Sequence, residues 1–219
     1  MIKQPQVFRR ALLIAVGLGL AGLQSVAHAQ STTRLMVGFP AGGGTDAIAR
    51  ILAEPLQAEL GAPVVVENKA GAGGQIAAQA LKMAAPDGHT LFLSHDHSVT
   101  ILPMVMKSPG FDPAKDFVPV AGFATFVNAI ALSGGTPATS FKGYVDWVRQ
   151  QGGGKGAVGI PAPASVPQFL VQEIAKKNGL DLVAAPYRGS APMVTDMLGN
   201  QIAAGVGSVP DFIENHKAG

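Results

Sequence analysis

The sequence predicts an α/β fold in which parallel-rich sheets are flanked by helices and arranged in two lobes. From residue 34 onward, short β-rich runs alternate with helical patterns through short connections. Such alternation is typical of parallel strands joined by crossover helices. A mostly apolar run over 118–132 is too long for one ordinary strand. We therefore expect the chain to cross there from one lobe to the other, because the alternation restarts beyond it.

Residues 1–29 have the pattern of a secretory signal peptide. A basic start that includes the pair Arg9-Arg10 precedes an apolar run over 11–23, and residues 27–29 read Ala-His-Ala, a cleavage pattern. The apolar run is short for a membrane span. A Sec signal is favoured over a twin-arginine signal because the residue before the arginine pair is off pattern. We therefore expect the protein to work outside the cytoplasm.

Composition excludes several classes of protein. The chain has 219 residues, of which 47% are hydrophobic and 14% charged, too apolar to be disordered. It has no cysteine, which excludes a disulfide scaffold, a zinc-thiolate site and a thiol nucleophile. The formal charge is +2, but residues 1–29 hold three of the 16 basic side chains and no acidic one, which leaves 13 basic against 14 acidic residues. No basic stripe for nucleic acid remains.

Residues 30–124 are expected to form lobe 1. Its first helix is expected to start at Thr45 or Asp46 and to be kinked or broken at Pro55. The first helix should bury one face, made of Ile48, Ile51, Leu52, Leu56 and Leu60. A second helix is predicted over Gln75–Ala84. The predicted strands are Arg34–Phe39, Val64–Glu67 and Thr90–Ser94.

Residues 125–219 are expected to form lobe 2. The sequence then stops where another strand should begin, and a chain that crosses only once leaves its first sheet short of partners. We therefore expect a fragment of a longer protein in which lobe 1 is incomplete. One helix is predicted to be capped by Ser140, another to open at Ser165 or Pro167, and two more to cover Pro192–Leu198 and Pro210–His216. The predicted strands are Gly156–Ile160, Leu182–Ala185 and Gln201–Val206.

Two glycine-rich loops follow the first two predicted strands. Glycines let a ligand approach the backbone N–H groups, and a helix start adds unpaired donors and a positive dipole end. Loops at the carboxyl ends of neighbouring parallel strands face one crevice, so we expect an anion-binding site there. The alternative is a tight turn with a Thr or Asp cap. The candidate ligand-binding residues are Phe39, Ala41, Gly43, Gly44, Thr45 and Asp46 in the first loop and Gly73, Gly74 and Gln75 in the second.

Polar residues also follow the third predicted strand. His95 and His97 form a His-x-His pattern beside Asp96, which suggests a metal site. A third protein ligand is not evident, so a polar loop that faces a ligand is the better interpretation, and we expect no metal. Ser94, His95 and Asp96 are the candidates here.

In the second lobe, equivalent strand-to-helix loops carry further candidates. Arg188 can bind a carboxylate through two N–H groups or lie in a surface ion pair. Ser165 and Ser190 can cap helices or offer hydroxyl groups to a ligand. No G-x-S-x-G motif surrounds either serine, so we expect no catalytic nucleophile and no enzyme. The candidate residues are Ala164, Ser165, Tyr187, Arg188, Gly189, Ser190 and Ser208.

A dehydrogenase is the alternative interpretation of the first loop. Gly42-x-Gly44-x-x-Ala47 loosely fits a dinucleotide-binding fingerprint, and Glu67 ends the next strand near where a ribose-binding acid is expected. An exported NAD-binding Rossmann-type oxidoreductase is therefore kept as the second hypothesis. A P-loop is excluded because no Gly-Lys-Ser/Thr follows the glycines.

Taken together, several segments resemble the Bug family, the extracytoplasmic solute receptors of tripartite tricarboxylate transporters. The resemblance implies a two-lobed periplasmic-binding-protein architecture of type II, the Venus-flytrap kind, with a small carboxylate held between the lobes largely by backbone amides and ordered waters. It also implies that the protein is a periplasmic monomer, needs no cofactor and delivers its ligand to a membrane permease. The segments that carry it are VGFPAGGGTDAIAR (37–50), PVVVENKAGAGGQIAAQALKMAAPDGHTL (63–91), FDPAKDFVPVA (111–121), PYRGSAPMVTDMLGNQI (186–202) and VPDFIENHKAG (209–219).

The sequence departs from the family pattern at three places. PAPASVPQFL stands where the family often has a Gly/Ser-rich loop followed by His-Leu, and Gly207-Ser208 replaces an Asp-Asn pair. His95-Asp96-His97 stands in place of a stretch of small residues. The family also normally continues well beyond residue 219. These departures affect the identity of the expected ligand.

Overall fold

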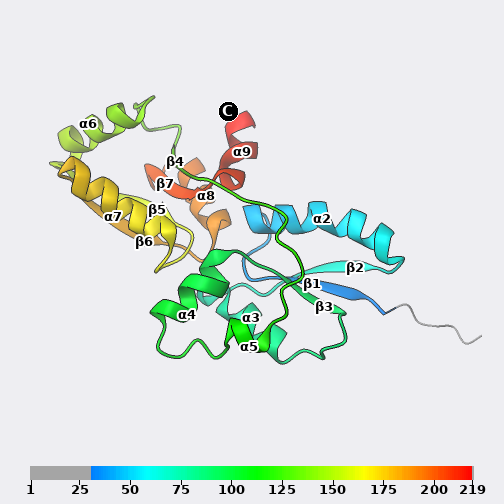
Figure 1. The fold of residues 1–219 in the computed structure, drawn as a ribbon. Helices are drawn as coiled ribbons and strands as arrows, with labels where there is room; N and C mark the ends of the chain where they lie inside the picture. Colours follow the sequence, from blue (N-terminus) through cyan, green and yellow to red (C-terminus); the bar gives the residue numbers. More distant parts are fainter. Residues whose placement is uncertain (1–30, 219) are drawn as a thin grey trace, which may run out of the picture. The chain divides into compact units, whose positions relative to one another are not determined.

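The computed structural model describes residues 31–218, which form two β-sheets flanked by helices (Figure 1). The strand order is β2-β1-β3 in the first sheet and β4-β7-β5-β6 in the second. The strands are β1 (Thr33–Val37), β2 (Val64–Asn68), β3 (Thr90–Leu93), β4 (Asn128–Leu132), β5 (Lys155–Ile160), β6 (Asp181–Pro186) and β7 (Ala204–Ser208). The helical segments are α2 (Gly44–Leu60), η1 (Ala72–Gly74), α3 (Gln75–Lys82), η2 (His97–Ile101), α4 (Leu102–Val105), α5 (Pro113–Asp116), α6 (Phe141–Gly152), α7 (Val166–Asn178), α8 (Ser190–Leu198) and α9 (Val209–Ala218).

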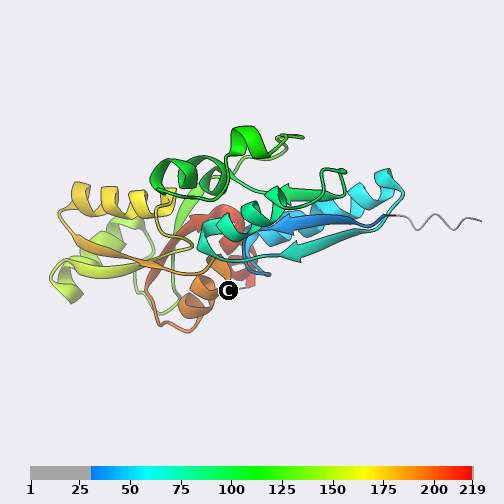
Figure 2. The same cartoon turned by 90° about the horizontal axis from the view of Figure 1, so that it is seen from below.

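The first sheet is parallel throughout, as the alternation of strands and helices predicted. Central β1 pairs with β2 on one side and β3 on the other, and Val37 is in register with both Asn68 and Leu93. Figure 2 shows the arrows of these strands pointing the same way. The loops that follow the three strands therefore leave the same edge of the sheet.

Helices cover both faces of the first sheet because side chains alternate along a strand. Leu35 and Val37 of β1 pack with Ala49 of α2 on one face. On the other side of the sheet, α3 contributes the fully buried Ala77, whose Cβ lies 3.5 Å from the position that a Cβ on Gly38 would take. The exit of β1 is thus held between two helices.

Helix α2 differs from its prediction in three respects. Gly43, not Thr45 or Asp46, is the N-cap, because the Asp46 carboxylate is bonded to other partners described below. The helix also runs through Pro55 without a break. Ile51 is 75% exposed and Leu60 is 50% exposed, so the prediction that both are buried was wrong. The buried face centres on Ala49 and excludes Ile51, two positions farther along.

The second sheet is mixed. Strands β5, β6 and β7 are parallel, whereas β4 runs antiparallel to β7 with Asn128 opposite Ser208. Val158 and Ile160 of β5 share one core with side chains of α6 and α7. On the opposite face, Gly159 leaves room for Met193 of α8, which a Cβ there would meet at 2.8 Å. This sheet too is covered on both faces.

Two of the three proposed helix caps in this part are confirmed. The Ser140 hydroxyl accepts a hydrogen bond from the Gly143 amide at 3.0 Å, and the Ser165 hydroxyl accepts one from the Gln168 amide at 3.4 Å. Ser190 is instead the first residue of α8, and Gly189 is the N-cap with φ of 106°. Strand β7 begins three residues later than predicted, because Asn200 adopts a left-handed turn conformation before it.

The predicted crossing has no regular structure over 117–127 before it enters β4. The boundary between lobes at 124/125 stays a prediction, and the expected signal peptide over 1–29 lies outside the described residues. Within residues 31–218, no helix has the length and apolar character needed to span a membrane.

Gly74 offers a test of how tightly the second glycine loop packs. It has φ of 92°, and a Cβ there would lie 2.2 Å from Oγ of the buried Ser98. We predict that Gly74→Ala lowers the unfolding free energy by about 3 kcal/mol or more, since overpacking adds to backbone strain. The measurement is urea unfolding followed by circular dichroism.

Gly88 is the matched control for this substitution. It has a similar φ of 81°, but a Cβ there would meet nothing within 4 Å. Gly88→Ala should therefore cost only the backbone strain, about 1–2 kcal/mol. Equal losses for the two variants would contradict the packing explanation.

Candidate functional site

Loops at the strand ends of both sheets enclose a cavity of about 530 Å³. This volume lies in the range of small-molecule sites. The wall includes the three loops that follow β1, β3 and β5, and the segment 121–126 of the crossing. Its lining residues are Phe39, Gly43, Gly44, Thr45, Ile48, Leu93, Ser94, His95, Asp96, His97, 121–126, Asn128, Pro161, Ala162, Ser165, Val166, Pro167, Ser190, Ser208, Pro210 and Asp211.

Four helices of the described part begin at this cavity. Helices α2, α7, α8 and α9 each place a residue of the first turn in its wall. The beginning of a helix has unpaired N–H groups and a partial positive charge. Their convergence favours an anionic group in the cavity.

The start of α2 is already in contact with a carboxylate of the chain itself. The Gly44 amide donates a hydrogen bond of 3.0 Å to Oδ1 of Asp211 in α9. The other oxygen, Oδ2, accepts bonds from the Ser208 amide at 2.8 Å and from its hydroxyl at 2.7 Å. At the first glycine loop, where the sequence predicts an anion-binding site, a carboxylate of the chain itself therefore occupies the Gly44 amide.

The glycines of the first loop allow this close approach. A Cβ on Gly43 would lie 2.8 Å from the Ser190 hydroxyl, and one on Gly44 would lie 2.8 Å from the Asp211 carboxylate. Neither position needs a left-handed conformation, because neither glycine has a positive φ. Glycine is therefore required here by the contact between α2 and the starts of α8 and α9.

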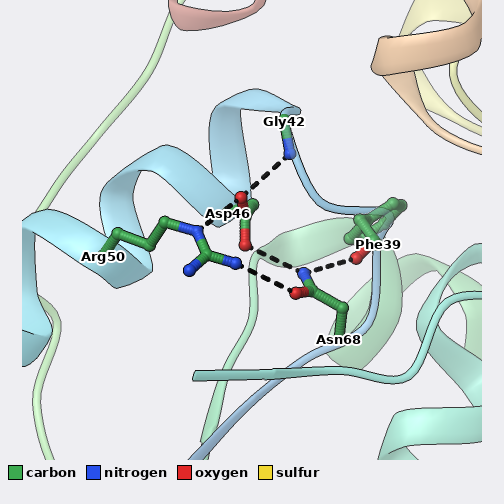
Figure 3. Close-up of polar contacts among 5 residues, drawn as sticks. All are labelled: Phe39, Gly42, Asp46, Arg50 and Asn68. Carbon is green, nitrogen blue, oxygen red and sulfur yellow. Dashed lines mark hydrogen bonds and ion pairs between the residues drawn. The ribbon is translucent and has the colours of Figure 1, made fainter. Parts of the chain in front are cut away.

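Asp46 holds the first loop in place (Figure 3). Its carboxylate accepts hydrogen bonds from the Gly42 amide and from Nε of Arg50, both at 2.9 Å, and from Nδ2 of Asn68 at 3.0 Å. Asn68, at the end of β2, also donates to the Phe39 carbonyl at 3.0 Å. The network ties the exit of β1 to the first turn of α2 and to the neighbouring strand.

These bonds outweigh the effect of burial on Asp46. Burial by itself raises the pKa of this carboxyl, but the hydrogen bonds from Arg50, Gly42 and Asn68 hold the pKa below its usual value of 3.8. A lowered pKa in the folded state means that the charged form stabilises the fold above pH 3.8. That stabilisation is lost as the pH falls through the folded-state value.

The histidine loop packs against aromatic rings of the cavity. His95 stacks on Phe39 with ring centroids 4.8 Å apart and meets Phe126 edge-on at 5.8 Å. His97 is only 5% exposed, and neither of its ring nitrogens has a hydrogen-bond partner. The His95 Nδ1 has no hydrogen-bond partner either, and it lies 3.6 Å from the Asp96 carboxylate.

Both imidazoles are neutral at pH 7. Burial, and next the neighbouring His95, lower the pKa of His97 to about 4, although Asp96 opposes the shift. Burial also lowers the pKa of His95 against the opposing effect of Asp96 and Asp211. Within residues 31–218, no group of three or more His, Cys, Asp or Glu side chains could hold a metal ion.

The second glycine loop lines a different, smaller cavity of about 250 Å³. Gly73 faces this space together with Tyr187, Arg188 and Gly189 from the loop after β6. The Tyr187 hydroxyl donates to Asp196 at 2.8 Å, and burial followed by this bond raises the pKa of Tyr187 to about 12. Arg188 makes no ion pair or hydrogen bond with another described residue.

The structure therefore distributes the predicted ligand residues over several places. The large cavity brings together Phe39, Gly43, Gly44, Thr45, Ser94, His95, Asp96, Ser165, Ser190 and Ser208, whereas Gly73, Tyr187, Arg188 and Gly189 line the small one. Ala41, Asp46, Gly74, Gln75 and Ala164 line neither. The side-chain amide of Gln75 instead donates to the Pro109 carbonyl, and the backbone amide of Ala164 donates to Oε1 of Gln168.

Sequence reasoning missed two important parts of the wall. The segment 121–126 was predicted only as a connection, although a chain that crosses between sheets must pass beside the space between them. Asp211 was missed as well. An acidic residue in the first turn of a helix that follows a strand was its available signal.

A cavity between strand-end loops of two α/β sheets, at the start of several helices, is a typical place for a small-molecule site. The chain belongs to the tripartite tricarboxylate transporter receptor family, whose model matches residues 48–219. Protein BugT of Bordetella pertussis (strain Tohama I) is 31% identical over 95% of this chain and 66% of its own length. A UPF0065 protein of Cupriavidus necator is 33% identical over 84% of this chain and 57% of its own.

Solved structures show the same fold, that of periplasmic binding proteins. A periplasmic transporter is similar with a TM-score of 0.80 and 35% identity, covering 88% of this chain and 64% of that one. An R. palustris protein solved with adipate has a TM-score of 0.79 and 28% identity over 87% and 64%. MatC from Rhodopseudomonas palustris with bound malate has a TM-score of 0.71 and 25% identity, and the match covers 85% of this chain and 63% of MatC. The chain spans at most about two thirds of the length of these relatives.

The Asp46 network predicts a large loss of stability on neutralisation. In Asp46→Asn an amide faces donors that the carboxylate now satisfies, so we expect the unfolding free energy to fall by about 2–4 kcal/mol. Equilibrium urea unfolding at pH 7 measures the loss. The variant should also show a weaker dependence of stability on pH below 3.8 than the native chain.

Asp146→Asn provides a matched control. Asp146 pairs with Lys142 at the same helical spacing, but its side chain is 38% exposed, against 4% for Asp46. We expect this exposed pair to contribute less than about 1 kcal/mol. A loss at Asp146 as large as at Asp46 would show that burial does not decide the difference.

Proposed function

We propose that the chain is an extracytoplasmic solute receptor that binds a small carboxylate in the large cavity and delivers it to a tripartite tricarboxylate-type permease. One observation carries the proposal: four helices begin at a single cavity of about 530 Å³ between the loops of two sheets. The alternative functions named by the sequence do not require such convergence.

The backbone supplies the expected donors. Among the described residues, the amide of Thr45 in the first turn of α2 has no hydrogen-bond partner, and neither does the amide of Ser190 in α8. Both residues line the cavity, and amides fixed by a helix lose no freedom when they bind an anion. The solved relatives with adipate and malate support a carboxylate as the ligand class.

The family supports the proposed delivery and location. Its members are described as receptors of tripartite tricarboxylate transporters, and one solved relative is a periplasmic binding protein, BugD. The signal-like pattern over 1–29 supports the same compartment for this chain. We expect a monomer that needs no cofactor.

The dehydrogenase hypothesis fits the site less well. The Gly44 amide, which would meet the pyrophosphate of a dinucleotide, is bonded to Asp211. Glu67, the expected ribose ligand, pairs with Lys69 at 2.7 Å and lies 3.8 Å from Arg34. Both groups of the fingerprint are thus engaged with other residues.

Calorimetric titration tests the proposal directly. We expect heat of binding with members of a panel of small mono- and dicarboxylates at pH 7, and no heat with NAD. Binding of NAD with no response to any carboxylate would overturn the receptor function in favour of the oxidoreductase.

Gly43→Ala tests whether the contact between α2 and α8 forms the site. The new methyl group would lie 2.8 Å from the Ser190 hydroxyl and push the two helix starts apart, so carboxylate affinity should fall more than about tenfold. The double variant Gly43→Ala/Ser190→Gly should recover affinity. Gly134→Ala is the control, because a Cβ there meets nothing within 4 Å. Unchanged affinity in Gly43→Ala would show that this loop is only a turn.

A further inference from the structure

Asp211 changes the charge that the large cavity offers to a ligand. A carboxylate has about four lone-pair positions for hydrogen bonds. Those of Asp211 accept three, from the Gly44 amide and from the amide and hydroxyl of Ser208. Asp211 is also a lining residue of the cavity, and the fourth position has no partner among the described residues.

The charged side chains in the cavity wall are all acidic. Asp96 and Asp211 line it, and within residues 31–218 no Lys or Arg does. Arg50 of α2 is paired with Asp46, and neither of these residues lines the cavity. The starts of α2 and α8 suit one ligand carboxylate, but a second carboxylate would have no cationic side chain to meet it.

The histidines in the cavity wall do not supply a positive charge. His97 is only 5% exposed, and its ring nitrogens are buried without a hydrogen-bond partner among the described residues. Its Nε2 lies against Gly73 of the second glycine loop. Neutral imidazoles add no positive charge that could compensate for Asp96 and Asp211.

We infer that the cavity takes a ligand with one carboxylate and one ammonium group joined by an apolar stem, and that Asp211 selects it over dicarboxylates by facing the ammonium group. The stem lies among apolar side chains such as Phe39 and Phe126. An ammonium group donates to the remaining acceptor position of Asp211, whereas a second carboxylate there would be repelled. This inference rests on the proposed receptor function.

The experiment compares three six-carbon acids by calorimetry on the full chain at pH 7. The acids are 6-aminohexanoate, adipate and hexanoate, which end in an ammonium, a carboxylate and a methyl group. We expect 6-aminohexanoate to bind more than about tenfold tighter than adipate, with hexanoate between them. In Asp211→Asn, which keeps an oxygen for the Gly44 amide but loses the charge, this preference should fall to about twofold or less.

Asp146→Asn serves as the control for charge, because this exposed carboxylate on α6 does not line the cavity. It should keep the native preference, and circular dichroism verifies that both variants are folded. Adipate binding as tightly as 6-aminohexanoate to the native chain would overturn the inference and leave the receptor function standing. A preference that persists in Asp211→Asn would overturn the role of Asp211. No binding of any of the three acids would count against the receptor function itself.

Discussion

The hydrogen bond from the Gly44 amide to Asp211 is the contact on which the arrangement of the site depends. It joins the first turn of α2, which follows the first sheet, to the first turn of α9, which follows the second. The same carboxylate binds Ser208 at the end of β7, so one side chain connects two helix starts and a strand end. The cavity wall on this side is built around that carboxylate.

Close contacts between backbone segments explain why this site is rich in glycine. Gly43 and Gly44 make room for Ser190 and Asp211, and Gly189 makes room for Pro40, which a Cβ would approach to 2.5 Å. In the second loop, Gly73 and Gly74 make room for His97 and Ser98. Many of these glycines therefore bring protein segments together, and the space and donors that result make up the proposed ligand site.

Charge in the site is divided between paired and unpaired groups. Asp46 is satisfied by three donors and holds the loop, whereas Asp211 faces the cavity and retains an acceptor position. The buried histidines are neutral and incompletely bonded. Such a site supplies anion-binding capacity through helix starts and cation-binding capacity through a carboxylate, a combination suited to a ligand with both charges.

The sequence by itself determined the order of strands and helices, the parallel first sheet and the position of the glycine loops at its edge. These features depend on local periodicity and turn residues, which neighbouring residues encode. The family resemblance followed from the same segments. Only the tertiary structure decided which loops share a cavity: the second glycine loop turned to a smaller space, and Asp211, distant in sequence, reached the start of α2. A contact across 167 positions depends on how the two sheets pack, and no local pattern in the chain encodes it.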